Sequence, residues 1–131
     1  MSTSEPTSTG PVLDPETLSI LASELQADAA PGLMESLVQT FIRDAEARSG
    51  RIADAAGAYD LQGLEHESHA LGSSAATFGA MALHHLARAI EAACQGRDVD
   101  KAVGLSVGMD AAVSAAAAAL SDYLKQQEPP D

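Results

Sequence analysis

Apolar residues recur every three or four positions along most of the chain, which is the spacing of a helix with one buried face. The first such stretch follows Asp14 and Pro15, an N-cap and a first-turn residue typical of helix starts, and should end near residue 27. Pro, Asp and Gly residues separate the stretches that follow it. These predict four longer helices, at about residues 31–56, 60–78, 80–95 and 98–125.

No segment alternates between apolar and polar residues with the period of two that is typical of a strand. The connections are short, so consecutive helices should pack as antiparallel neighbours. We therefore predict an all-α fold, an antiparallel four-helix bundle with a short additional N-terminal helix. The bundle should cover residues 14–125, between a disordered N-terminal tail at 1–13 and a C-terminal tail at 126–131. Gly104 and Gly108 interrupt the last predicted helix, where each costs about 1 kcal/mol relative to alanine, and we interpret them as close-packing or bending positions.

The composition narrows the class of partner. The 131 residues suit one domain, and 46% apolar residues with 3% aromatics suit a core of Ala, Leu, Val and Ile. A net charge of −12 would repel nucleic acid and the anionic surface of a membrane, so neither is an expected partner. The single cysteine, Cys94, cannot form an internal disulfide, and no secretory signal or membrane-spanning run is evident, so a cytoplasmic location is expected.

One histidine lies on the polar side of the third predicted helix. The core stripe of this helix centres between Leu64 and Leu71, and His69 points roughly 130° away from it, so its side chain should be exposed. Small residues follow the histidine on this face, which should therefore be nearly flat. Flatness favours direct phosphoryl transfer between proteins, because the donor oxygen, the phosphorus and the imidazole nitrogen must lie nearly in line. The neighbours expected on this face are Gln62, Glu65 and His66 before the histidine, and Gly72, Ser73 and Ala76 after it.

An exposed imidazole has the chemistry of a phosphate carrier. The neutral ring has a nucleophilic nitrogen at neutral pH, and its phosphoramidate is reactive enough to pass the group on. We expect Nε2 of His69 to attack, because it is the ring nitrogen farther from the backbone. The chain has no glycine-rich phosphate loop, no Walker lysine and no kinase signature. It should therefore receive phosphate from another protein, with no autokinase activity and no cofactor.

The run from His69 to Ala80, HALGSSAATFGA, resembles the signature of histidine-containing phosphotransfer (HPt) domains, especially of the quorum-sensing LuxU type. The similar pattern extends from about residue 14 to residue 125. The resemblance implies a monomeric four-helix bundle that shuttles phosphate between receiver-domain aspartates in a multistep phosphorelay, with His69 as the phosphorylated residue. A hybrid histidine kinase is an alternative donor. Other positions that fit the pattern are Leu37, Phe41, Asp44, Ala45, Leu64, Gly79, Leu83, Leu86 and Glu91.

Gly72 departs from the family pattern, which usually has a lysine three residues after the histidine. The lysine charge would steady the phosphoryl oxygens, and losing one such contact costs roughly 1.5–3 kcal/mol. A basic residue from another helix could replace it, or the receiver's own lysine and metal ion could suffice. Gly72→Lys is expected to speed transfer or to lengthen the lifetime of the phosphohistidine. Ser73 and Ser74 fit the family, in which a hydroxyl here orients the site through a hydrogen bond. The candidate basic residues are Arg43, Arg48 and Arg88.

Other interpretations of the same residues remain. A degenerate HPt-like bundle would bind receiver domains without efficient transfer, and a structural or metal-binding bundle would make the motif a coincidence. His66 and His69 could share a metal on one helix face, but no His-Glu-x-x-His motif is present, so no metal site is expected. We interpret His84 and His85 as boundary residues and Cys94 as a small buried side chain. The partner surface is expected to combine the His69 face with Leu18, Leu21 and Met34.

Overall fold

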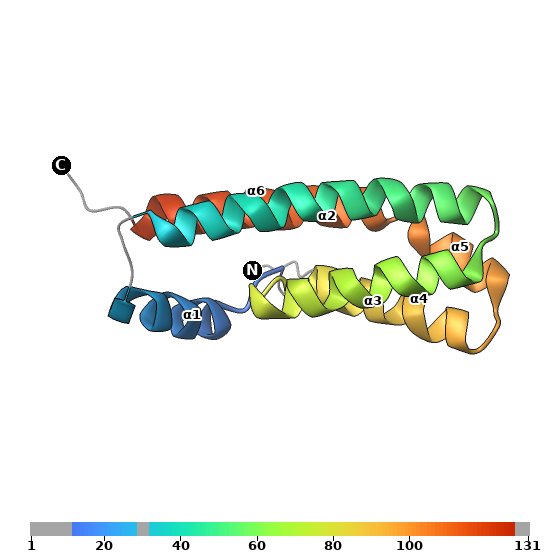
Figure 1. Cartoon of the computed structure of the whole chain (residues 1–131), viewed down its shortest axis with the longest axis horizontal. Helices are drawn as coiled ribbons and strands as arrows, with labels where there is room; N and C mark the ends of the chain where they lie inside the picture. Colours follow the sequence, from blue (N-terminus) through green and yellow to red (C-terminus); the bar gives the residue numbers. More distant parts are fainter. Residues whose placement is uncertain (1–11, 29–31, 128–131) are drawn as a thin grey trace, which may run out of the picture.

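The computed structural model describes residues 12–28 and 32–127, and the regular elements in these ranges are all α-helices (Figure 1). The predicted all-α class is thus confirmed. Residues 1–11 and 128–131, which fall in the two predicted tails, lie outside the described residues, and the last helix continues to residue 127. The helices are α1 (Pro15–Asp28), α2 (Leu33–Gly57), α3 (Leu61–Thr77), α4 (Met81–Gln95), α5 (Val99–Ser106) and α6 (Met109–Gln127).

The four long helices form the predicted antiparallel bundle in two layers. α2 and α6 lie side by side in one layer, and α3 and α4 form the other (Figure 1). α1 lies in line with the α3–α4 pair, next to the part of α2 and α6 that extends beyond that pair. The α3–α4 contact is the most extensive in the bundle, and α3 also packs on α2. α3 therefore packs mainly against α4 and α2, with a smaller contact to α5, and keeps one side open to solvent.

Local chemistry fixes the start of α3 and so the direction of its side chains. The Asp60 carboxylate accepts a hydrogen bond from the Gly63 N–H at 3.0 Å, which gives a partner to one of the first-turn donors. From this start, residues three and four apart point to the core. The buried stripe predicted for this helix is confirmed by the residues that are 0% exposed, which are Leu64, Ser68, Leu71 and Ala75.

The last predicted helix is wrong as a single element, because the chain bends by 40° between α5 and α6. At the bend, the Val107 N–H donates to the Gly104 carbonyl at 3.3 Å and the Gly108 N–H donates to the Leu105 carbonyl at 3.2 Å, the pattern of a tightened last turn. Val107, which lies at the bend, is 81% exposed, so its side chain makes no core contact there. Within the described ranges no single helix has the length and hydropathy of a membrane span, and one bent pair, α5 with α6, reaches them when taken together.

α1 joins the rest of the molecule at the turn between α3 and α4. The Asp14 N–H donates to the Gly79 carbonyl at 2.7 Å, and Gly79 has a left-handed φ of 68°. A Cβ added there would lie 2.9 Å from the Asp14 carbonyl oxygen, so the close contact requires glycine. Leu18 packs against this turn and is 0% exposed, so the expectation that it belongs to a partner surface is wrong. Leu21 and Met34 are half-buried.

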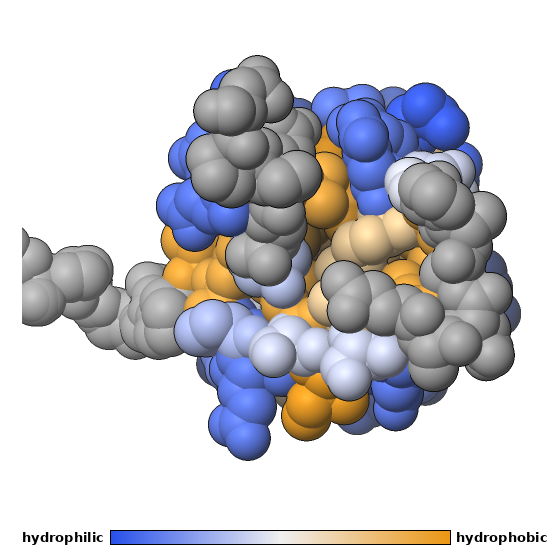
Figure 2. Space-filling model, turned by 90° about the vertical axis from the view of Figure 1, so that its left-hand side faces the viewer, coloured by the Kyte–Doolittle hydropathy of each residue, from blue (hydrophilic) through white to orange (hydrophobic). Residues whose placement is uncertain are grey.

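Apolar surface is present at the α1 end of the molecule. Figure 2 looks onto this end and shows apolar residues between hydrophilic flanks. Ile20 on α1 is 54% exposed and Leu33 at the start of α2 is 37% exposed. Large apolar side chains that lie close together on a surface mark a place where another molecule can bind.

Candidate functional site

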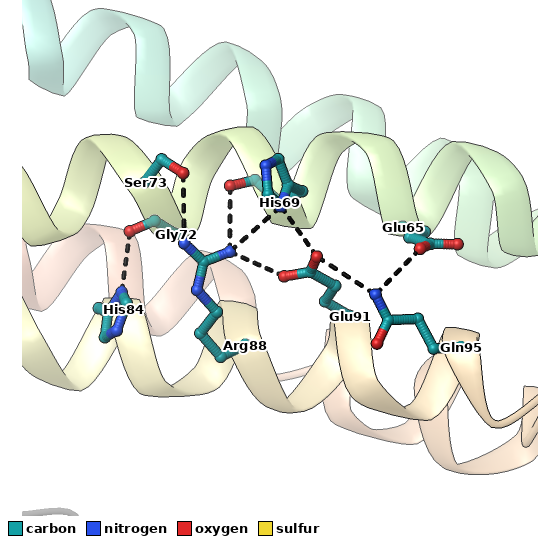
Figure 3. A network of polar contacts seen from close by, with 8 residues as sticks. All are labelled: Glu65, His69, Gly72, Ser73, His84, Arg88, Glu91 and Gln95. Carbon is teal, nitrogen blue, oxygen red and sulfur yellow. Dashed lines mark hydrogen bonds and ion pairs between the residues drawn. The ribbon is translucent and has the colours of Figure 1, made fainter.

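His69 stands on the solvent side of α3, as its position on the helix predicts. Its side chain is 63% exposed, whereas Leu71, two residues later, is 0% exposed. Arg88 and Glu91 approach the ring from α4, across the α3–α4 contact (Figure 3). The polar partners of the histidine therefore come from a neighbouring helix and not from α3 itself.

Glu91 fixes the tautomer of His69. Nδ1 of the ring lies 2.8 Å from Oε2 of Glu91, whose side chain is only 14% exposed. Because an ionised carboxylate only accepts hydrogen bonds, Nδ1 must carry the proton and donate it. The lone pair of the neutral ring is then on Nε2. In Figure 3 this second ring nitrogen points away from Glu91, so the nucleophilic atom is left without a partner in the network drawn there.

Arg88 spans the space between Glu91 and Ser73. Its Nη1 donates to Oε1 of Glu91 at 2.7 Å, and its Nη2 donates to the Ser73 hydroxyl at 3.2 Å. Nη1 also lies 3.4 Å from the carbonyl oxygen and 3.4 Å from Nδ1 of His69. Since Nδ1 donates to Glu91, its approach to Nη1 is a close contact between two donors and not a hydrogen bond. The guanidinium is thus held beside the ring by its neighbours.

Gly72 does not form part of a flat exposed face, so this element of the prediction is wrong. The residue is buried, and a Cβ added to it would lie 3.1 Å from Cζ and 3.2 Å from Nη1 of Arg88. The Arg88 side chain lies over the position from which a residue-72 side chain would project. A helical wheel gives directions relative to one helix axis, so it cannot show a side chain that reaches across from another helix. His84, which is half-buried, donates from Nδ1 to the Gly72 carbonyl at 2.9 Å.

The structure distinguishes among the three arginines that the sequence left open. Arg88 contacts the His69 backbone and lies beside its ring. Arg48 lies between α2 and α3, where it donates to Asp44 at 3.0 Å and to Glu67 at 2.9 Å. Arg43 is exposed on α2. Of these three, Arg88 is the residue placed to act on a group carried by the histidine.

The charge of Glu91 is stabilised by its partners. Partial burial favours the neutral carboxyl, but the hydrogen bonds from His69 and Arg88 outweigh burial and lower the pKa of Glu91 from its usual 4.5. Glu91 is therefore ionised at neutral pH, as its acceptor role requires. Burial raises the pKa of the nearby Cys94 thiol, and the negative charges of Glu65 and Glu91 raise it further. Buried Cys94 thus remains a protonated thiol, in agreement with its interpretation as a small buried side chain.

The residues predicted before the histidine share one open hollow with it. Gln62, Glu65, His66 and His69 line this hollow on the solvent side of α3. Gln95 of α4 donates to Glu65 at 3.2 Å, so polar contacts continue along the α3–α4 boundary (Figure 3). His66 and Gln62 are exposed. This side of the ring is therefore open to an approaching partner.

The residues predicted after the histidine divide into two groups. Ser73 is exposed and accepts from Arg88, so it borders the site with Gly72. Ser74 and Ala76 are half-buried, and no contact within residues 12–28 and 32–127 joins either side chain to His69. In the same ranges no three His, Cys, Asp or Glu residues are grouped so that they could hold a metal ion.

Sequence reasoning missed the roles of two residues of α4. Glu91 entered only as a position of the HPt pattern, and Arg88 only as one of three candidates. Their spacing of three places them on one face of α4, which is the only signal that the sequence carried. Nothing in the sequence of α4 shows that this face turns toward His69, because that depends on how the two helices pack.

Comparison with known proteins identifies the family and the fold of the chain. Residues 36–127 match the Hpt domain family, and the chain belongs to that family. The fold is similar to the crystal structure of histidine-containing phosphotransfer protein B (HptB) from Pseudomonas aeruginosa PAO1, with a TM-score of 0.79, 21% identity, and coverage of 91% of this chain and 99% of that chain. Comparison with curated protein sequences gave no match. Membership of the family assigns the chain to histidine phosphotransfer in phosphorelays, in which Hpt domains work with receiver domains and kinases.

Proposed function

We propose that this chain is a phosphocarrier that accepts a phosphoryl group on Nε2 of His69 from a receiver-domain aspartate, or from a histidine kinase, and passes it to another receiver. The observation that carries the proposal is the 2.8 Å contact from Nδ1 to Glu91, which leaves Nε2 as the nucleophile of a side chain that is 63% exposed. Exposure matters because donor and acceptor are both proteins, whose carboxylates must reach the ring.

Each transfer step balances without a further reactant. The lone pair of Nε2 attacks the phosphorus of an aspartyl phosphate, in line with the bond between phosphorus and the carboxylate oxygen, which breaks. An N–P bond forms, the aspartate leaves as a carboxylate, and the ring becomes positively charged while Nδ1 keeps its proton. The negative charge of Glu91, 2.8 Å from Nδ1, offsets the charge of that ring. Transfer to the next receiver is the same reaction in reverse.

The partners that follow from this chemistry are receiver domains of response regulators, a hybrid histidine kinase, or both. We expect the chain to act as a cytoplasmic monomer of the LuxU type, with residues 14–125 as the HPt unit and no cofactor of its own. Nucleic acid and membranes are not expected partners, because the net charge is −12. The receiver should cover the hollow beside His69, and Leu21 and Met34 at the α1 end are candidates for apolar contacts with it.

A second candidate function rests on Gly72. An HPt-like bundle without the usual lysine could bind receivers and fail to transfer phosphate efficiently. The guanidinium of Arg88 counts against this alternative, because it places a positive charge 3.4 Å from Nδ1 of His69. Both functions predict that the chain binds receiver domains, but only the phosphocarrier should become labelled with phosphate.

Incubation with phosphorylated receiver domains tests the proposal. The wild-type chain should acquire an acid-labile, alkali-stable label, His69→Gln should acquire none, and His66→Gln, one turn away, should be labelled like the wild type. Receiver binding without any label would support the degenerate bundle. Label on His69→Gln together with its loss from His66→Gln would overturn the assignment of the site.

A further inference from the structure

A glycine and an arginine from different helices share one space beside His69. Gly72 is buried, and a Cβ added there would lie 3.1 Å from Cζ of Arg88 and 3.4 Å from Cβ of Ala87. The contact with Arg88 is short enough that the guanidinium would have to shift by a few tenths of an ångström for a Cβ alone, and a longer side chain would project toward the volume that it occupies. A large side chain at residue 72 and the observed position of Arg88 are therefore mutually exclusive.

We propose that Arg88 is the residue that binds the phosphoryl oxygens on His69, and that residue 72 is a glycine so that Arg88 can reach across from α4. The proposal rests on the proposed function of His69. The positive charge of the site then comes from Arg88 on α4, one turn before Glu91, and not from a lysine at residue 72 on α3. Gly72 and Arg88 are then one functional pair, and neither can be interpreted without the other.

The guanidinium has the donors for this role. Nη1 donates to Glu91 at 2.7 Å and Nη2 donates to Ser73 at 3.2 Å, which orients the group beside the ring. An arginine has five N–H donors, and among the described residues the Nε–H and one N–H of Nη2 have no partner. Nη1 is 3.4 Å from Nδ1, and Nε2 is only two bonds farther around the ring. Arg88 can therefore meet a phosphoryl group on Nε2 by a small rotation, since its side chain is 35% exposed.

The surroundings of His69 favour a cation beside the ring. Glu91 accepts from the ring, Glu65 lies one turn before it in the same hollow, and the chain carries a net charge of −12. A phosphoryl group that arrives there adds negative charge beside two carboxylates, which is unfavourable without a positive partner. Among the residues that the structure describes, Arg88 is the basic side chain that contacts both His69 and Glu91.

This pairing changes the expected result of adding a lysine. In the wild-type background, Gly72→Lys places a second cation where the guanidinium lies, so phosphorylation should be no faster than in the wild type. In an Arg88→Ala background the space is vacant, and the same lysine should restore the lost charge. Methionine at residue 72 has a similar length and no charge, so it separates charge from packing.

The experiment uses the full chain and potassium phosphoramidate, a small phosphoryl donor that needs no partner protein, and follows the rate of phosphohistidine formation and its lifetime. Arg88→Ala should reduce the rate or the lifetime by about tenfold or more, the size expected for one charge-assisted contact. Arg88→Ala with Gly72→Lys should return to within about threefold of the wild type, and Arg88→Ala with Gly72→Met should not. Arg48→Ala is the control, because it removes an arginine that bridges two carboxylates away from His69.

The outcomes separate this inference from the proposed function. If the wild type gains no label on His69, the proposed function fails and takes this inference with it. If the wild type is labelled on His69 and Arg88→Ala reacts at the same rate with the same lifetime, only the role of Arg88 is overturned. Equal rescue by lysine and methionine, or rescue by neither in variants with wild-type unfolding curves, would also overturn the proposed pair.

Discussion

The two interfaces of α3 contain the same kind of polar cluster. Toward α2, Glu67 accepts a hydrogen bond from Arg48 at 2.9 Å and forms an ion pair with Arg51 at 3.1 Å, and its side chain is 15% exposed. Toward α4, Glu91 accepts from His69 and from Arg88 at 2.8 and 2.7 Å, and its side chain is 14% exposed. In both clusters a mostly covered carboxylate joins two nitrogen groups across a helix pair.

The two clusters differ in whether they contain an atom that can act as a nucleophile. Guanidinium groups are donors only, so the cluster around Glu67 has no atom that can attack an electrophile. At Glu91 one of the two donors is an imidazole, which keeps a second nitrogen with a lone pair. A carboxylate between two nitrogen groups thus leaves no nucleophile on the α2 side of α3, whereas an exposed imidazole in place of a guanidinium leaves one on the α4 side, as the proposed function requires.

Removal of the two carboxylates should give the largest contrast. Glu91→Ala should slow phosphoryl transfer by about 10- to 100-fold, because Nδ1 loses its acceptor and Arg88 loses its 2.7 Å partner. Glu67→Ala should transfer at the wild-type rate. The rates are measured with one phosphorylated receiver under single-turnover conditions. Equal slowing in the two variants would remove the distinction between the clusters.

Glu67 should also contribute to the stability of the fold. Glu67→Ala should lower the free energy of unfolding by about 1–2 kcal/mol, because two arginines that flank α3 lose their shared, mostly covered partner. Urea denaturation measures this change, with the slope of the transition unaltered. A Glu67→Ala chain as stable as the wild type would mean that the α2-side cluster is not structural.

Ser73 probes the α4-side cluster more gently. Ser73→Ala removes the acceptor of one Arg88 N–H at 3.2 Å and leaves the bond to Glu91, so transfer should slow by about two- to fivefold. Ser114→Ala, at an exposed serine of α6, is the matched control and should have no effect. Loss of transfer as severe as that of Glu91→Ala would show that Ser73 does more than orient the guanidinium.

Acidification gives the smallest effect. The pKa of Glu91 is lowered in the folded chain, so its ionised form adds stability above the ordinary value of 4.5, and this stability is lost as the pH falls toward the lowered value. Between pH 7 and pH 3, the wild type should therefore lose more of its free energy of unfolding than Glu91→Gln, which has no carboxyl at this position to protonate. Denaturation curves at several pH values measure the difference. Parallel losses in the two chains would contradict the ionised Glu91.

The bundle and the exposure of His69 could be predicted because they depend on properties of single helices. The spacing of Leu64 and Leu71 defines the buried side of α3, and helix geometry then places His69 on the exposed side. The sequence left open whether the last predicted helix bends, because glycine at residues 104 and 108 is compatible both with close packing and with a break. The bend and the hydrogen bonds of Val107 and Gly108 in the folded chain distinguish the two.

The contacts around His69 could not be predicted because they depend on the relative rotation of two helices. Gly72 lies near the histidine on α3, and the helical wheel therefore places it on a bare face. In the folded chain, Arg88 crosses the boundary and covers it, and Glu91 reaches Nδ1 from the next turn of α4. The burial of Leu18 could not be predicted either, because it depends on a contact outside α1: the side chain packs against the turn at Gly79.

In the proposed function, Glu91 holds the proton of His69 on Nδ1 and leaves Nε2 to carry phosphate. The most direct test is NMR of the phosphorylated chain with 15N-labelled histidine, which identifies the nitrogen bonded to phosphorus through its coupling to 31P. We expect one phosphohistidine, at residue 69, with phosphorus on Nε2 and a proton on Nδ1. Phosphorus on Nδ1 of His69, or on any other residue, would contradict it.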